Sequence, residues 1–248
     1  MRLYGKRELI YEWEWRTLRL PKRLMEIAAL IPEEGSVVDV GTDHGFLPVW
    51  LALGGERRIT ATDINAAPLS RAVSAAEDAG VGHKIRFVLC DGLDGCEPSD
   101  VVVIAGMGGE TIARILERAA WTREALLFLQ PMSKAETLRQ WLYENGYNIT
   151  REVLVKDSGV IYPILSAVGG DAPVPNSAEL HYGVNVRQDD LFREHLTEII
   201  QKAERRLSGL EASRKPDDLR RREETARLLA DVRQALALMT DAKREGNI

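Results

Sequence analysis

Short apolar runs alternate with amphipathic segments over the first two thirds of the chain. Runs typical of buried strands and segments with helical spacing follow one another in this order: strands at 36–40, 58–63, 85–90, 99–104 and 126–130, and helices at 20–31, 47–53, 68–79, 110–119 and 135–145. Two further strands, at 149–156 and 161–168, flank the turn Asp157-Ser158-Gly159 and are predicted to form a hairpin. The alternation predicts an α/β fold, in which helices cover both faces of a mostly parallel sheet and the hairpin adds an antiparallel edge.

A different pattern follows the linker at 169–177, which is short and rich in Gly and Pro. One apolar stripe covers residues 191–210 and a second covers 219–239. Pro216 lies between the stripes and cannot continue the first helix. The second part of the chain therefore predicts two long helices that fold back as a coiled-coil hairpin. We expect two domains, at 1–168 (with an N-terminal extension at 1–19) and at 178–248.

Composition narrows the class of protein. The 248 residues contain no apolar run long enough to cross a bilayer, and the charged, aromatic N-terminus does not resemble a signal peptide. We therefore expect a soluble cytoplasmic protein with no membrane partner. The only cysteines are Cys90 and Cys96, and the four histidines are scattered, so neither a disulfide framework nor a metal site is expected.

The charge distribution is uneven although the net charge is −5. Basic clusters stand at Arg205-Arg206, Arg214-Lys215 and Arg220-Arg221-Arg222. Such clusters either form a solvated helix face or contact RNA phosphates, because screening makes local charge more important than the total. Composition alone leaves both interpretations open.

Polar or glycine-rich segments follow four of the predicted parallel strands. Asp39-Val40-Gly41-Thr42-Asp43-His44 stands at the first strand, Asp63 ends the second, Asp91-Gly92-Leu93 follows the third, and residues 105–109 follow the fourth. Open α/β sheets bind ligands at the carboxyl ends of their strands. Gly41 allows close approach of the backbone, Asp63 is placed to accept from ribose hydroxyls, and Asp91 can accept from an adenine amino group. The four segments together predict a nucleoside-type cofactor.

The residue at position 43 distinguishes between cofactors. A dinucleotide fingerprint requires glycine near this position, next to a pyrophosphate, whereas this chain has Asp43. A carboxylate is acceptable near a sulfonium or an amine, so S-adenosylmethionine fits better than NAD. Cys90 and Cys96 lack the context of a covalent nucleophile. The fourth strand is followed by Gly106-Met107-Gly108-Gly109 rather than by the Asn/Asp-Pro-Pro-aromatic segment of many exocyclic-amine methyltransferases.

Several of these segments carry a specific resemblance. Asp39-Val40-Gly41-Thr42-Asp43-His44-Gly45-Phe46-Leu47-Pro48, Asp91-Gly92-Leu93, Ile104-Ala105-Gly106-Met107-Gly108-Gly109, Leu129-Gln130-Pro131 and Leu138-Arg139-Gln140-Trp141-Leu142 occur in that order. They resemble the bacterial tRNA adenine(22)-N1 methyltransferase family, TrmK, over residues 20–239. The resemblance implies a Rossmann-like class I methyltransferase sheet, a C-terminal coiled coil that helps to hold tRNA, and a monomer or weak dimer.

The chain departs from that family at three places. Met132 and Pro163 stand where Asn and Glu are typical, and residues 1–19 extend beyond the expected start of the family. In that extension Tyr11, Trp13 and Trp15 are expected either to pack on the fold or to stack on RNA.

The resemblance also assigns site residues. Asp43 is the candidate for stabilising the cationic methylated adenine, with a helix N-cap or a cofactor contact as its alternative role, and Met107 is the candidate apolar wall for the base. The expected contacts of S-adenosylmethionine are Asp39, Gly41, Thr42, Asp43, His44, Asp63, Ile64, Asp91, Gly92, Leu93, Ala105, Gly106 and Gly108.

Two alternative functions remain open from the sequence. A non-catalytic RNA-binding protein could retain a nucleoside pocket, and a small-molecule methyltransferase could use the helical hairpin only to dimerise. Transfer of a methyl group to tRNA distinguishes the leading interpretation from both.

Overall fold

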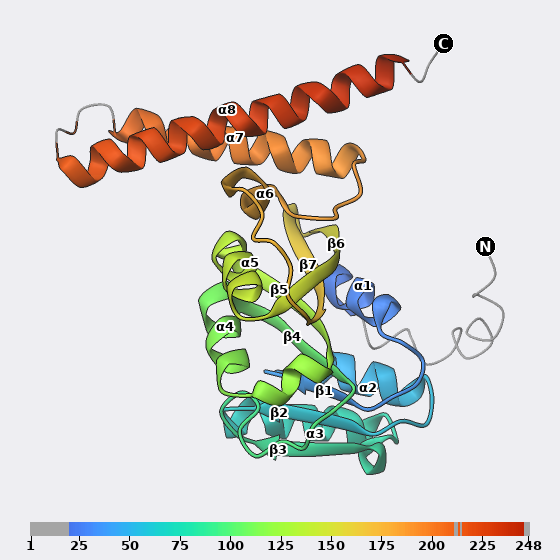
Figure 1. Ribbon diagram of the computed structural model, residues 1–248. Coiled ribbons are helices and arrows are strands. Elements are labelled where there is room, and N and C mark those ends of the chain that lie inside the picture. Colours follow the sequence, from blue (N-terminus) through green and yellow to red (C-terminus); the bar gives the residue numbers. More distant parts are fainter. Residues whose placement is uncertain (1–19, 211–212, 214, 246–248) are drawn as a thin grey trace.

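A seven-stranded sheet forms the centre of the first part of the molecule (Figure 1). The computed structural model describes residues 20–210, 213 and 215–245. The strand order is β3-β2-β1-β4-β5-β7-β6, and the strands are β1 (Val37–Val40), β2 (Ile59–Asp63), β3 (Ile85–Leu89), β4 (Val101–Gly108), β5 (Leu126–Ser133), β6 (Tyr147–Asp157) and β7 (Val160–Gly169). The first five are parallel, and β7 pairs antiparallel with both β5 and β6. The predicted parallel sheet with an antiparallel edge is confirmed.

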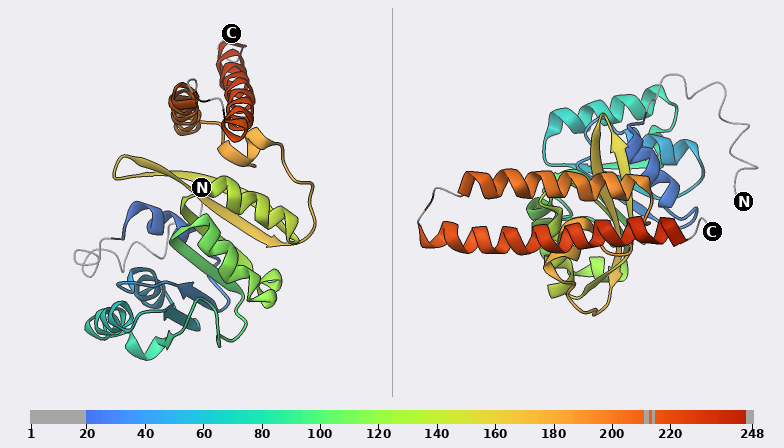
Figure 2. Two further views of the ribbon diagram at one scale, coloured as in Figure 1. Left: turned by 90° about the vertical axis from the view of Figure 1, so that its left-hand side faces the viewer. Right: turned by 90° about the horizontal axis from the view of Figure 1, so that it is seen from above.

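Helices cover both faces of this sheet, and the sheet has a buried core on each side. Figure 2 shows α1 (Lys22–Leu30), α2 (Phe46–Leu53) and α3 (Ala66–Asp78) on one face and α4 (Gly109–Glu117) and α5 (Ala135–Glu144) on the other. All four residues of β1 are buried, as expected for a central strand packed on both sides. The short 3-10 turns η1 (Gly82–Lys84) and η2 (Ala120–Glu124) complete the connections.

The strands β4 and β5 extend further than the sequence pattern predicts. The segment Ala105–Gly108, expected as a turn, continues β4 and pairs with the end of β5. Two register shifts, on either side of Met107, interrupt the pairing. Irregular pairing of this kind bends a strand and redirects its side chains. It also interrupts the alternation of apolar and polar positions by which a strand is predicted from sequence.

The C-terminal part consists of three helices at the β6 end of the sheet. They are α6 (Ser177–Tyr182), α7 (Asp190–Leu210) and α8 (Pro216–Glu245). Figure 2 shows α7 and α8 side by side as an antiparallel hairpin, which confirms the two predicted long helices. The six-residue α6 was not predicted; it begins with a capping box in which Asn176 and Glu179 satisfy each other's backbone N–H groups.

A buried ion pair joins α6 to the sheet. Arg139 on α5 and Glu152 on β6 are both fully buried, and Nη2 of the arginine donates to Oε2 of the glutamate at 2.7 Å. The Nη1 group of Arg139 donates to the carbonyl of Leu180 on α6 at 2.7 Å, and Glu152 also accepts from the backbone N–H of Val184. One pair of charged side chains therefore holds α5, β6 and α6 together.

No helix in residues 20–210 or 215–245 is both long and apolar enough to span a bilayer. The aromatic residues Tyr11, Trp13 and Trp15 lie outside the described residues, so their expected packing or stacking role stays a prediction.

Candidate active site

The loop after β1 is fixed by hydrogen bonds to the neighbouring strand. The backbone N–H groups of Gly41 and Thr42 both donate to the carbonyl of Thr62 on β2, at 2.8 and 2.9 Å. The hydroxyl of Thr62 donates to the carbonyl of Gly92 at 3.0 Å, which ties the loop after β3 to the same edge. The loops after β1 and β3, which both carry predicted cofactor contacts, are therefore tied to the end of β2 between them.

Gly41 lies against Met107, which comes from the irregular end of β4. A Cβ atom at Gly41 would stand 2.2 Å from Cε of Met107, and the backbone φ of 74° disfavours any L side chain. The glycine therefore leaves room for the methionine side chain beside the β1 loop. The two segments predicted to meet cofactor and base, 39–44 and 105–109, are in contact.

A cavity of about 200 Å³ opens at this edge of the sheet. Six of the predicted contacts line it: Asp39, Gly41, Thr42, Asp43, Ala105 and Gly106. Five further residues from α1, α2 and the segment before α1 close it: Pro21, Arg23, Leu24, Phe46 and Leu47. None of these five was predicted as a contact. Phe46 and Leu47 directly follow the β1 loop in the sequence, whereas Pro21, Arg23 and Leu24 reach it by a tertiary contact that no local pattern reports.

The carboxyl group of Asp39 lies at the base of this cavity. Burial raises its pKa from 3.8 to about 6, the nearby Thr42 hydroxyl partly offsets the shift, and the charge of Asp63 adds to it. Oγ1 of Thr42 forms no well-aligned hydrogen bond with the described residues. The site therefore holds a buried carboxyl group that a cationic ligand would stabilise in its ionised form.

Asp43 occupies the mouth of the cavity in a left-handed backbone conformation, with φ of 47°. Its side chain is 62% exposed and forms an ion pair with Arg71 at 3.2 Å, and the ring of His44 lies 3.7 Å away. The N-cap of α2 is Gly45 and has no side-chain cap, so the alternative role of Asp43 as a helix cap is wrong. The carboxylate instead faces solvent beside the cavity.

The remaining predicted contacts follow the same edge beyond this cavity. Asp63 is buried at the end of β2 and accepts from the N–H of Asn65, whereas Ile64 is exposed. Asp91 lies after β3 and forms an ion pair with Arg118 at 2.8 Å, which lowers the pKa of its carboxyl group. Leu93 is buried in the core on the α4 side. The edge thus has an acidic residue at the end of each of the first three strands or shortly after it.

Gln130 is a further residue of the site that the sequence analysis missed. Its side chain is fully buried at the end of β5, where Oε1 accepts from the N–H of Gly106 at 3.2 Å. Nε2 donates to the carbonyl of Pro131 at 3.1 Å. The Gln130-Pro131 pair in the sequence is a signal for such a role. A buried side-chain amide needs hydrogen-bond partners, and at the end of β5 the backbone of β4 and β5 supplies them.

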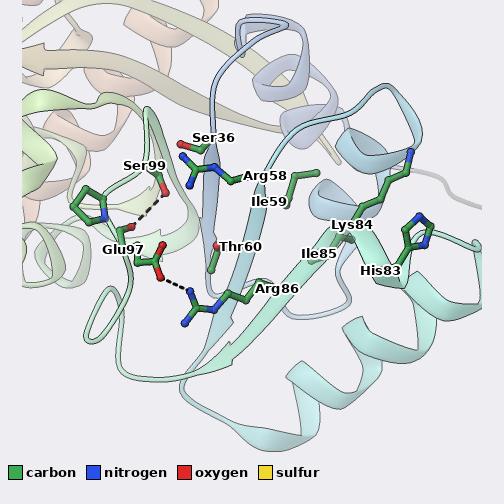
Figure 3. A pocket seen from close by; sticks show the side chains of 11 residues that line it. Ser36, Arg58, Ile59, Thr60, His83, Lys84, Ile85, Arg86, Glu97 and Ser99 are labelled. Carbon is green, nitrogen blue, oxygen red and sulfur yellow. Dashed lines mark hydrogen bonds and ion pairs between the residues drawn. The ribbon is translucent and has the colours of Figure 1, made fainter.

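Another cavity, of about 280 Å³, lies at the opposite edge of the sheet, near the first residues of β2 and β3. Figure 3 shows Arg86 directed toward Glu97 in this cavity, with which it forms an ion pair at 2.9 Å. None of the predicted site residues lines it. The predicted site residues lie at the carboxyl edge of the sheet instead, and six of them line the cavity there.

The two cysteines lie close together after β3, with their sulfur atoms 4.0 Å apart. Burial raises the pKa of Cys96 to about 12, and the neighbouring Cys90 contributes to the shift. A thiol with such a pKa is a poor nucleophile at neutral pH. Within the described part of the chain, no group of three or more His, Cys, Asp or Glu side chains could hold a metal ion.

A parallel sheet with an antiparallel β7, and a cavity at its carboxyl edge, define the Rossmann-like class I methyltransferase fold. Residues 20–165 match the family described as Methyltransferase domain. The tRNA (adenine(22)-N(1))-methyltransferase of Bacillus subtilis (strain 168) is 35% identical over 159 residues, which are 62% of this chain and 67% of that protein.

Solved structures agree with the sequence comparison. The crystal structure of the B. subtilis M1A22 tRNA methyltransferase TrmK has a TM-score of 0.79 at 28% identity, and the match covers 88% of this chain and 99% of that one. A Streptococcus pneumoniae protein in complex with S-adenosyl-L-methionine has a TM-score of 0.77 at 27% identity and covers 88% and 100%. The chain belongs to the methyltransferase-domain family and, within it, to the bacterial tRNA adenine(22)-N1 methyltransferase family, TrmK.

Proposed function

We propose that this protein transfers a methyl group from S-adenosyl-L-methionine to N1 of adenine 22 in tRNA. The observation that carries the proposal is the contact between Gly41 and Met107, which brings the predicted cofactor loop and the predicted base shelf together. The B. subtilis relative, named for this reaction, supports the choice of substrate.

The residues at the carboxyl edge fit S-adenosyl-L-methionine. Asp39 offers a buried carboxyl group to the α-amino group, and Arg23, which lines the same cavity, offers a guanidinium to the carboxylate. Nε of Arg23 is buried without a hydrogen-bond partner in the described part of the chain, while Nη1 contacts Asp157 at 3.1 Å. Asp63 is placed to accept from the ribose hydroxyls and Asp91 from the adenine amino group.

When bound, the cofactor supplies an electrophilic methyl group on a sulfonium centre. Adenine N1 carries a free lone pair at neutral pH, so the protein must position the base rather than remove a proton from it. We assign to Asp43 the stabilisation of the positive charge that develops on the adenine, because its carboxylate is exposed beside the cavity. Met107 provides an apolar wall for the base.

The helical part at 178–248 is proposed as a tRNA-contacting domain that acts beside the methyltransferase domain at 1–168. The exposed arginines at 205, 206, 220, 221 and 222 of α7 and α8 support this role, since phosphate contacts are made mainly by such side chains. We further propose that the protein acts in the cytoplasm as a monomer or weak dimer.

Incubation with labelled S-adenosyl-L-methionine and unmodified tRNA, followed by nucleoside mapping, tests the reaction. We expect 1-methyladenosine at position 22, and no incorporation into the same tRNA with guanine at that position. Binding of tRNA without transfer would instead identify a non-catalytic RNA-binding protein. Transfer only to small amines would identify a small-molecule methyltransferase.

A further inference from the structure

A cavity of about 370 Å³ lies where the helical hairpin meets the sheet. Its floor includes Pro131 to Ser133 at the end of β5 and Val160 to Pro163 at the start of β7. The opposite wall comes from α7 and α8, and includes Lys202, Arg206 and Leu228. The volume is within the range of roughly 300–1,000 Å³ that is typical of ligand pockets.

Strand register places this cavity directly beside the candidate active site. Pro131 pairs with Met107, and Ser133 pairs with Gly108. Because β5 is parallel to β4 and β7 is antiparallel to β5, the end of β5 and the start of β7 lie at the same edge as the cofactor loop. The floor of the junction cavity is therefore continuous with the shelf proposed to hold the adenine.

The wall on α7 is basic. Lys202 and Arg206 are one helical turn apart, and both side chains are exposed. Arg206 forms no ion pair with any described residue, and the carboxylate nearest Lys202 is that of Glu198 at 3.7 Å. Three other charged residues line the cavity. Lys134 and Arg139 are neutralised by ion pairs with Glu110 and Glu152, and Glu136 contributes a negative charge.

The floor, in contrast, offers apolar and aromatic surface. Met132 is 43% exposed at the end of β5, and Tyr162 on β7 is partly exposed. The cavity therefore has cationic side chains on one wall and an aromatic and a thioether side chain on the other. This arrangement suits a nucleotide, because its phosphate can pair with the cations while its base stacks on the floor.

We infer that the junction cavity is an RNA subsite that binds a nucleotide adjoining the target adenine, with Lys202 and Arg206 contacting its phosphate and Met132 and Tyr162 contacting its base. The inference rests on the proposed function and deepens it, because it assigns a binding site to the RNA nucleotide next to the methylated adenine. It also gives the hairpin a contact with the RNA at the active site itself.

The test compares a double variant, Lys202→Ala/Arg206→Ala, with a matched control, Arg227→Ala/Arg233→Ala. Arg227 and Arg233 lie on α8 of the same hairpin and are exposed, but neither lines the cavity. Both proteins lose two positive charges, so a general loss of attraction affects them alike. Titration with S-adenosyl-L-methionine checks that the cofactor site of each variant is intact.

We expect the double variant to raise KM for unmodified tRNA about tenfold or more. The slope of log K for tRNA binding against log salt concentration should become shallower, by an amount equivalent to the loss of about one to two phosphate contacts. The control should change KM less than about threefold. Phosphate-ethylation interference should lose its signal next to adenine 22 only in the double variant. Equal losses in the two variants, or an interference signal that persists in the double variant, would overturn the subsite while wild-type methylation stands. A wild-type protein that does not bind tRNA would overturn the proposed function as well.

Discussion

The side-chain carbonyl of Gln130 accepts a hydrogen bond from the backbone N–H of Gly106 at 3.2 Å, between the ends of β5 and β4. The bond holds a glycine with φ of 80° at the point where the β4 pairing shifts register. The buried amide therefore fixes the shape of the shelf that faces the cofactor loop.

Replacement of this amide should impair catalysis more than cofactor binding. Gln130→Leu leaves the N–H of Gly106 without its partner, at a cost of about 1–3 kcal/mol in the free energy of unfolding. We expect kcat to fall about tenfold to a hundredfold, while the Kd for S-adenosyl-L-methionine changes less than about threefold. Steady-state kinetics and calorimetric titration measure the two effects. Gln140→Leu, on the exposed side of α5, is the matched control, and an equal loss there would contradict the assignment.

Asp43 is expected to act on the reaction rather than on cofactor affinity. Asp43→Ala should abolish methylation and leave the Kd for S-adenosyl-L-methionine within about tenfold of the wild-type value. Arg71→Ala removes the ion pair at 3.2 Å but keeps the carboxylate, so it separates loss of the pair from loss of the charge. Comparable loss of methylation and of cofactor binding in Asp43→Ala would make Asp43 a binding residue only.

Cofactor affinity should depend on pH through Asp39, whose pKa is raised from 3.8 to about 6 by burial. Above pH 6 the carboxylate is ionised and can pair with an ammonium group; below pH 6 it must first lose a proton. The Kd for S-adenosyl-L-methionine is therefore expected to rise by up to about tenfold for each pH unit between 6 and 4. Titrations across this range should show the rise in the wild type and not in Asp39→Asn.

The same group lowers the stability of the free protein at neutral pH. Because the folded-state pKa lies above the ordinary value, stability is lost as pH rises from about 4 to about 6, and the full cost of about 3 kcal/mol remains above pH 6. Asp39→Asn should therefore unfold at higher urea concentration than the wild type at pH 7.5. A variant that is less stable at this pH would contradict the assignment of burial as the cause.

The ion pair between Arg139 and Glu152 is expected to be essential to stability. Both side chains are fully buried, so Glu152→Gln leaves the arginine without its countercharge and should reduce the free energy of unfolding by about 3–5 kcal/mol. Glu97→Gln, which removes the partner of exposed Arg86, should cost less than about 1 kcal/mol. Urea denaturation measures both, and similar costs would show that burial is not the cause.

Local pattern was sufficient to predict most of the sheet and the segment after β1 that lines the cavity at its carboxyl edge. The buried run at 37–40 and its following loop are contiguous in sequence, so Asp39, Gly41 and Asp43 could be assigned together. The end of β4 could not be predicted, because its register shifts suppress the alternation that marks a strand. The short α6 lacks the length at which helical periodicity becomes visible.

Residues that act through distant contacts could not be assigned from the sequence. Arg23 lies in an ordinary amphipathic helix, and only the packing of α1 brings it to the cavity. Arg139 and Glu152 look like surface charges in the pattern, and their burial follows from the arrival of α6 over α5 and β6. Such roles depend on which elements become neighbours, and local periodicity does not contain that information.

The attachment of α6 fixes where the helical part of the molecule lies against the sheet. Arg139 binds both Glu152 in the sheet and the carbonyl of Leu180 in α6, so α6, which contacts both α7 and α8, cannot leave β6 without exposing a buried charge. The span between the hairpin and the cofactor cavity is thus built into the fold. In the proposed reaction, this fixed distance would select the adenine: the base at the matching distance from the tRNA backbone held by the hairpin would reach the methyl group.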